Sequence, residues 1–165
     1  TIGKLQSCDN AVYIGGGTGI ADGIILKGKM IDFNARDDVK RSWELKIPSG
    51  ETIESCLSPK WMIHQWNISQ REKVETLDQL SQNQNANTIF EKATEAFSFL
   101  IQNRTQFFKA NHAKIEKIVI GQRLGIFMAN SKLISLLESN TDIPLDYSTD
   151  RRTAALGAAW KRICS

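Results

Sequence analysis

The spacing of apolar residues near the start of the chain predicts a small antiparallel sheet. Residues 11–14 are apolar and strand-prone, and they run into a glycine-rich segment at 15–19 (GGGTG). Two further strand-prone runs follow at 24–26 and 30–33. Apolar runs separated by short glycine-containing turns are typical of antiparallel neighbours. The first part of the chain therefore predicts a meander of three antiparallel strands.

Helical periodicity dominates the rest of the chain, after a polar surface loop predicted at residues 34–50. Apolar residues three and four positions apart predict amphipathic helices. The expected helices cover about residues 52–66 (continuing through Pro59), 74–80, 87–112, 123–139 and 151–163. Short apolar runs at 115–120 and 144–147 predict two more strands. This order predicts a single α/β domain over residues 1–165, with a mixed five-stranded sheet covered by helices.

The composition is that of an ordinary globular protein and excludes several classes of protein. Of the 165 residues, 41% are hydrophobic and 24% are charged, which excludes a wholly disordered chain. A net charge of +3 argues against a nucleic-acid partner, and no apolar run approaches the roughly 18 residues of a membrane span. Cys8, Cys56 and Cys164 lie far apart, so they predict reduced thiols in a cytoplasmic protein, without a disulfide framework or zinc spacing.

The glycine-rich segment at 15–19 is the strongest local signal for chemistry. Backbone N–H groups in such a turn can bind phosphate oxygens without obstruction by side chains. A Cβ at Gly17 would then occupy phosphate space, and we also expect a φ there that disfavours other residues. Neither a Walker motif nor a Rossmann motif is present, because a strand rather than a helix follows. A tight hairpin without a ligand explains the same residues equally well.

Two other segments carry weaker signals. Residues 118–125 place glycines where a strand passes into a helix, which is a favoured ligand position in open α/β sheets. A short strand–helix connection would need the same glycines. Residues 153–159 are rich in alanine and glycine. Such small side chains suit either the close packing of a helix on the sheet or one side of a pocket that admits the flat ring of a ligand.

Taken in order, these three segments resemble the carboxy-terminal half of sugar kinases of the ROK family, in the actin-like ATPase superfamily. Residues 14–29 look like the family's phosphate-binding hairpin, 118–125 like its adenosine-side turn, and 154–159 like its closing helix. The resemblance implies a ribonuclease H-like lobe. It also implies phosphate contacts at Gly16, Gly17, Thr18 and Gly19, and adenosine-side contacts at Gly121, Gln122 and Gly125.

Two further matches lie between these segments. Glu44 stands where the family has a glutamate that hydrogen-bonds sugar hydroxyls, although an ordinary solvated loop carboxylate is an equal alternative. Residues 53–58 resemble the family's Leu-Glu-x-x-x-Ser helix. The family's zinc-binding Cys/His cluster is absent from the sequence between them, so we predict no zinc and no other protein-bound metal.

The resemblance implies the nucleotide-binding lobe of an ATP-dependent kinase that acts on a hexose or N-acylhexosamine, with Mg²⁺ bound through the nucleotide and a homodimer as one allowed assembly. The family's catalytic Asp and a further glycine hairpin belong to an amino-terminal lobe that should precede residue 11. We therefore expect no catalytic base here and an inactive fragment; otherwise the base would have to be Asp9, Asp22 or Glu44. The sugar-sensing body of a ROK-type transcriptional regulator and a non-sugar actin-like ATPase domain are the alternatives.

Overall fold

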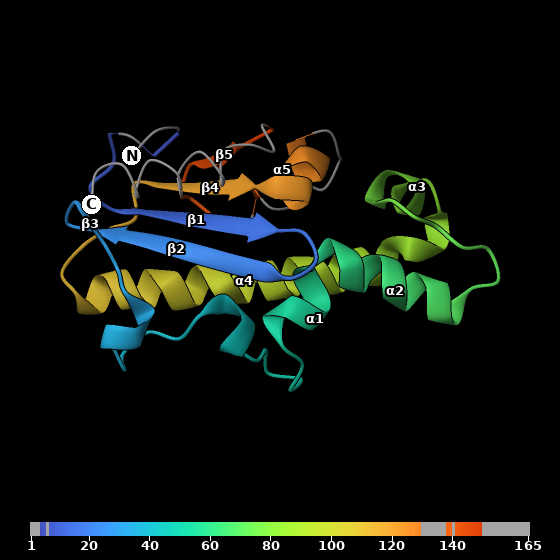
Figure 1. Cartoon of the computed structure of the whole chain (residues 1–165), viewed down its shortest axis with the longest axis horizontal. Helices are drawn as coiled ribbons and strands as arrows, with labels where there is room; N and C mark the ends of the chain where they lie inside the picture. The colour runs from blue at the N-terminus through green and yellow to red at the C-terminus, as the bar shows by residue number, and fades with distance from the viewer. Residues whose placement is uncertain (1–3, 6, 130–137, 140, 150–165) are drawn as a thin grey trace.

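The central feature of the computed structural model is a five-stranded sheet with strand order β3-β2-β1-β4-β5 (Figure 1). The structure describes residues 4–5, 7–129, 138–139 and 141–149. Its strands are β1 (Ala11–Gly16), β2 (Ile20–Leu26), β3 (Lys29–Met30), β4 (Lys117–Gly121) and β5 (Leu145–Tyr147). β2 is antiparallel to both β1 and β3, whereas β4 runs parallel to β1 and β5 runs parallel to β4. The predicted α/β class, the meander and the mixed five-stranded sheet are confirmed.

Five α-helices accompany the sheet in the described part of the chain. They are α1 (Ile53–Leu57), α2 (Pro59–Ser69), α3 (Leu77–Ser81), α4 (Asn87–Ala110) and α5 (Gln122–Ala129). α4 runs along the sheet in Figure 1, and its buried Phe97 and Phe108 join one core with Val12 and Ile14 of β1. Two neighbours in β4, Ile118 and Ile120, pair with those same β1 residues and share that core. The alternation of side chains along a strand therefore directs one face of β1 and β4 at the helices.

The single helix expected over residues 52–66 is wrong, because the chain forms two helices there. Ser58 adopts an extended backbone (φ −73°, ψ 137°) between α1 and α2, and its hydroxyl accepts a hydrogen bond from the Trp61 N–H at 3.3 Å. Pro59 occupies the first turn of α2. Proline has no N–H to continue the preceding helix, and it pushes the residue before it into an extended conformation. Pro59 therefore begins α2 instead of lying inside a longer helix.

The loop expected at the surface over residues 34–50 is partly buried, which corrects that prediction. Val39, Leu45 and Ile47 lie in the core, and Ser42 is fully buried. Two short 3-10 helices, Phe33–Ala35 and Ser42–Glu44, shape the segment. Its apolar residues are too few and too irregularly spaced to show a helix or strand period, so the sequence pattern alone missed their burial.

The second half of the chain follows the predicted order as far as it is described. α3, α4, β4 and β5 lie close to their expected ranges. The helix expected at 123–139 is described as α5 from Gln122 to Ala129. Residues 130–137 and the expected terminal helix at 151–163, which includes the small residues of 154–159, lie outside the described residues.

Candidate functional site

The two glycine segments that the sequence singled out lie side by side. β1 and β4 are parallel neighbours, so their carboxyl ends reach the same edge of the sheet, where Gly16 pairs with Gln122. The side-chain amide of Gln122 lies over the glycine turn that joins β1 to β2. A Cβ built at Gly15 would be 3.1 Å from Gln122 Nε2, and one built at Gly17 would be 3.1 Å from Gln122 Oε1. More than a hundred residues of sequence separate these segments. The carboxyl edge of parallel strands is the favoured ligand position in open α/β sheets.

The turn between β1 and β2 offers free backbone donors. The Gly17 N–H closes the turn by donating to the Gly19 carbonyl at 2.9 Å, and the Lys60 N–H at the start of α2 donates to the Gly17 carbonyl at 3.3 Å. Within the described residues, neither the Thr18 N–H nor the Gly19 N–H has a backbone or side-chain acceptor. Thr18 is exposed to solvent. The turn can therefore present two N–H groups and one hydroxyl to an anion.

The expectation of an unfavourable φ at Gly17 is wrong. Among the glycines that the structure describes, only Gly28 and Gly50 have a positive φ. A Cβ at Gly17 would meet only the Gln122 Oε1 atom within 4 Å, at 3.1 Å. Gly17 is therefore explained by the close approach of the Gln122 amide and not by backbone strain.

Three other predicted site glycines are required by packing. A Cβ at Gly16 would lie 2.6 Å from the Leu124 Cβ atom, which would prevent α5 from approaching β1. A Cβ at Gly121 would lie 2.2 Å from the Tyr13 hydroxyl, and one at Gly125 would lie 2.4 Å from the Ile120 carbonyl oxygen. Gly16 and Gly125 let α5 lie against the ends of β1 and β4, and Gly121 leaves room for the Tyr13 ring, so these glycines shape the site whether or not they touch a ligand.

Gln122 has a left-handed backbone conformation, with φ of 60°, at the junction of β4 and α5. This conformation costs a residue other than glycine on the order of 1 kcal/mol or more. Strained residues of this kind cluster at functional sites. The junction was predicted from its glycines, but no pattern in the sequence indicated strain at Gln122.

Glu54 is a site residue that the sequence analysis left without a role. Its carboxylate, in the first turn of α1, accepts a hydrogen bond from the Ile20 N–H at 3.2 Å. A Cβ at Gly19 would lie 2.4 Å from Glu54 Oε2, so a side chain at this position would displace the Glu54 carboxylate. The match of residues 53–58 to the family's helix marked this segment, but its contact with the turn depends on the fold.

Glu44 is exposed at the end of the 3-10 helix Ser42–Glu44. Its carboxylate accepts a hydrogen bond from the Arg41 N–H at 2.8 Å and lies 3.5 Å from the Arg41 Nη1 atom. No hydrogen bond joins it to the glycine turn in the part of the chain that the structure describes. The carboxylate is therefore oriented by its own segment and remains open to solvent.

The structure rules out two of the three carboxylates that were considered as alternative catalytic bases. The Asp22 side chain is fully buried, and its two oxygens are bound by the Ser42 N–H and the Arg104 guanidinium. Asp9 lies beside Gly28, at the other end of the six-residue strand β1, roughly 20 Å from the glycine turn at about 3.3 Å per residue. Neither group can reach a substrate held at the turn.

A cavity of about 350 Å³ lies between α2, α3 and α5, next to the β4–α5 junction. Its walls combine apolar side chains with a few polar groups, as is usual for pockets that bind small molecules. The lining residues are Pro59, Ile63, Glu75, Thr76, Leu77, Asp78, Arg123, Ile126 and Phe127. Arg123, one of its lining residues, directly follows Gln122 in the sequence.

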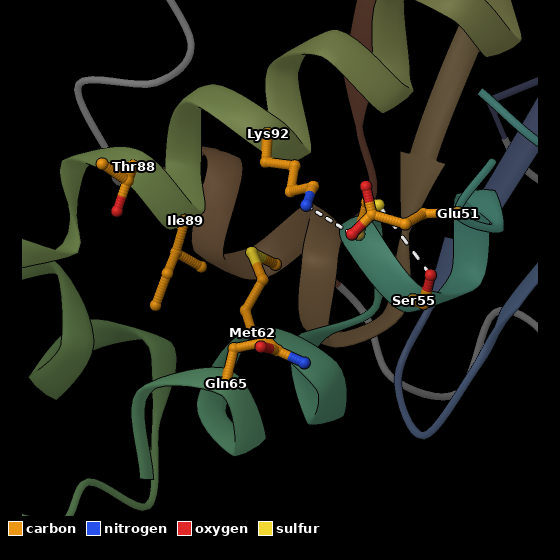
Figure 2. A pocket seen from close by; sticks show the side chains of 8 residues that line it. Glu51, Ser55, Met62, Gln65, Thr88, Ile89 and Lys92 are labelled. Atoms are coloured by element: carbon orange, nitrogen blue, oxygen red, sulfur yellow. Dashed lines mark hydrogen bonds and ion pairs between the residues drawn. The ribbon is translucent and has the colours of Figure 1, made fainter. Parts of the chain in front are cut away.

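A second cavity, of about 250 Å³, lies between α1, α2 and α4 and away from the glycine segments (Figure 2). Figure 2 shows an ion pair between Glu51 and Lys92 at its side. Burial raises the pKa of the Cys56 thiol, which keeps it protonated at neutral pH. Among the described residues, no group of three His, Cys, Asp or Glu side chains is arranged to hold a metal ion. The same part of the chain contains no helix long and apolar enough to cross a bilayer.

No protein-family model and no curated protein sequence matches this chain. Its structure is similar to that of the ROK hexokinase from Thermus thermophilus, with a TM-score of 0.69 at 15% identity over 98% of this chain and 60% of that chain. A ROK family glucokinase from Streptomyces griseus, in complex with glucose and AMPPNP, has a TM-score of 0.66 at 12% identity, over 96% of this chain and 62% of that one.

A ROK family transcriptional regulator, a homolog of the E. coli MLC protein, is also similar, with a TM-score of 0.65 at 17% identity over 93% of this chain and 45% of that chain. Identities this low establish the fold only. The chain has the α/β fold of part of the ROK-family sugar kinases, as the resemblance predicted, and it spans about 60% of the length of the two kinases.

Proposed function

We propose that this chain is the carboxy-terminal, nucleotide-binding lobe of an ATP-dependent sugar kinase of the ROK type. The observation that carries the proposal is the meeting of the glycine turn with the β4–α5 junction at one edge of the sheet. The similarity in fold to the glucokinase in complex with glucose and AMPPNP supports the same reading. Kinase activity would belong to a two-lobe protein, because the chain spans about 60% of the length of such enzymes.

In this proposal the turn binds the terminal phosphates of ATP. The free N–H groups of Thr18 and Gly19 and the Thr18 hydroxyl donate to phosphate oxygens, while Gly16 lets α5 pack against the turn and Gly17 leaves room for the Gln122 amide over it. Backbone donors of this kind suit phosphates because they need no reorganisation when the anion binds. Mg²⁺ would arrive with the nucleotide and neutralise part of the charge on the transferred phosphoryl group.

The adenosine would occupy the cavity between α2, α3 and α5. Gln122 lies between that cavity and the turn, so it can contact the phosphates or the ribose. The side chain of Arg123 is exposed at the cavity wall and supplies a positive charge. Gly125 would support the site by allowing α5 to lie close to β4, and Gly121 by leaving room for the Tyr13 ring of β1.

Glu44 would bind a hydroxyl of a hexose or an N-acylhexosamine. The catalytic base would come from the amino-terminal lobe, since transfer to a sugar hydroxyl needs a positioned carboxylate. A cytoplasmic location and the absence of zinc remain predictions from the spacing of the cysteines and histidines.

A sugar-sensing regulator is the second candidate, because the ROK family regulator shares this fold. A non-sugar actin-like ATPase domain is the third. The kinase and the ATPase require nucleotide binding, and only the kinase and the regulator require hexose binding. The phosphate turn is therefore the decisive feature to test.

The test is calorimetric titration of Mg-ADP into the wild-type chain and the Gly17→Val variant. We expect Gly17→Val to weaken binding about tenfold or more, equivalent to about 1.4 kcal/mol, because its branched side chain would crowd the Gln122 amide and the backbone donors of the turn. Gly23→Ala in β2 is the matched control, since a Cβ there meets nothing within 4 Å. Equal affinities of the wild type and Gly17→Val would remove the phosphate role of the turn.

A further inference from the structure

A buried ion pair joins β2 to α4 beneath the segment that carries Glu44. The side chains of Asp22 and Arg104 are both 0% exposed. Arg104 Nε and Nη2 each lie 2.8 Å from Asp22 Oδ2. Asp22 pairs with Ile14 across the β1–β2 ladder, so its side chain points into the apolar layer between the sheet and the helices.

Such a pair is not explained by stability alone. Burial lowers the pKa of Arg104, and the adjacent Asp22 carboxylate opposes that shift. Two charges removed from water lose solvation, and an apolar pair of similar volume is often equally stable or more stable. A charged pair retained in a core calls for an explanation from what else it binds.

The pair binds the backbone on both sides of Arg41. Arg104 Nη2 donates to the Lys40 carbonyl at 2.8 Å, and the Ser42 N–H donates to Asp22 Oδ1 at 2.9 Å. Between these two bonds, the Arg41 N–H donates to the Glu44 carboxylate at 2.8 Å. The 3-10 turn is completed by the Glu44 N–H, which donates to the Arg41 carbonyl at 3.0 Å.

We propose that Asp22 and Arg104 are positioning residues that clamp residues 40–44 to the sheet and helix layers and so orient the Glu44 carboxylate toward the sugar. The inference rests on the proposed sugar-binding role of Glu44. The clamp acts through the backbone: the ion pair holds the Lys40 carbonyl and the Ser42 N–H, and the Arg41 N–H between them holds the carboxylate. Neither Asp22 nor Arg104 contacts the sugar.

The test replaces the pair by apolar residues in the double variant Asp22→Val/Arg104→Met, which leaves no unpaired charge in the core. A second variant, Ser42→Pro, removes the N–H that Asp22 accepts from, together with the buried Ser42 hydroxyl, which has no hydrogen-bond partner in the described structure. Proline is tolerated there because residue 42 is the first position of a 3-10 helix and Arg41 before it is already extended. If the double variant does not fold, Ser42→Pro carries the test.

Two measurements are made on the full chain. The matched control is Glu51→Gln/Lys92→Met, which removes an exposed ion pair that also joins α4 to the segment before α1. Amide hydrogen exchange at Glu44 and Leu45 reports the order of the turn, since neither amide bonds directly to the clamp. Titrations with glucose, N-acetylglucosamine and N-acetylmannosamine measure sugar binding. Separate titrations with Mg-ADP measure nucleotide binding at the glycine turn.

We expect exchange at Glu44 and Leu45 to become at least tenfold faster in both clamp variants and to stay unchanged in the control. Hexose affinity should fall about as far as in Glu44→Gln, with Mg-ADP affinity within twofold of the wild type. Unchanged exchange, or equal losses of hexose and nucleotide affinity, would overturn the proposal. If exchange is faster in the clamp variants but the wild-type chain binds none of the three sugars, the clamp is supported and the sugar-binding role of Glu44 is refuted.

Discussion

At the scale of single residues, the most unusual position is Gln122, which combines backbone strain with a side chain that lies over the glycine turn. Its φ of 60° is one that glycine adopts freely and glutamine does not. The Gln122 amide approaches the positions of Gly15 and Gly17 from the neighbouring strand. A strained residue is retained at a site when its side chain contributes something that glycine cannot.

We therefore predict that Gln122→Gly increases the free energy of unfolding by about 1 kcal/mol while it weakens Mg-ADP binding. The gain comes from relief of the left-handed strain, and the loss comes from the missing amide. Urea denaturation and calorimetry measure the two quantities. Gln122→Ala is the control, because it lacks the amide but keeps the strain, so it should lose affinity without gaining stability. A Gln122→Gly variant that binds Mg-ADP as the wild type does would show that the amide has no role in the site.

At the scale of elements, the break between α1 and α2 brings both Glu54 and the Lys60 N–H into contact with the glycine turn. Glu54 of α1 accepts from the Ile20 N–H, and the Lys60 N–H of α2 donates to the Gly17 carbonyl. A continuous helix would not present both groups to the turn, because its Lys60 N–H would donate to the carbonyl four residues earlier in the helix. The cap formed by Ser58 is therefore part of the support of the site.

Replacing Ser58 by alanine should cost about 1 kcal/mol of stability, because the Trp61 N–H would lose its acceptor inside the protein. Chemical denaturation of the purified variant measures the change. Ser69→Ala, at the exposed C-terminal end of α2, is the comparison and should change the stability by less than about 0.5 kcal/mol. Equal stabilities of Ser58→Ala and the wild type would show that the cap does not hold α2.

The edge strand β5 gives the fold a dependence on acid pH through Asp146. Burial raises the pKa of this carboxyl. Hydrogen bonds from the Lys4 ammonium and the Tyr147 N–H lower the pKa by more than burial raises it, so the pKa lies below the ordinary 3.8. A depressed pKa stabilises the fold at pH values above 3.8, and this contribution disappears as the pH falls through the folded-state pKa.

Asp146→Asn should therefore be less stable than the wild type from neutral pH down to about pH 4, and the two should converge at lower pH. Urea unfolding at a series of pH values measures the difference. A difference that stays constant into strong acid would mean that another group carries the effect.

At the scale of the whole molecule, the candidate site is an open edge of the sheet and not an enclosed cleft. The turn, the β4–α5 junction and the cavity beside α5 all face the end of the sheet where β1 and β4 finish. Asp22 is locked in the buried pair, Asp9 lies at the far end of β1, and Glu44 is bound by Arg41. Phosphoryl transfer also needs a second surface that excludes water and aligns the phosphate.

We therefore predict that the isolated 165-residue chain folds but shows negligible phosphorylation of glucose, N-acetylglucosamine or N-acetylmannosamine. A coupled assay for ADP release measures the activity. Addition of an amino-terminal lobe should restore turnover, and an Asp→Ala change at that lobe's catalytic residue should abolish it again. Robust phosphorylation by this chain alone would contradict the two-lobe proposal.

The sequence by itself determined the strands and the location of both glycine segments, because these depend on local periodicity and on turn chemistry within a few residues. The mixed sheet could be inferred only from the order of these elements along the chain. Even the break at Ser58 follows from the proline beside it, although the apolar spacing on either side of Pro59 favoured one long helix. What only the tertiary structure decided are the contacts between distant residues: Glu54 against Gly19, Asp22 against Arg104, and the Gln122 amide over the glycine turn. Each of these side chains is a common polar residue with no local pattern, and its partner is selected by the way strands and helices stack after they form.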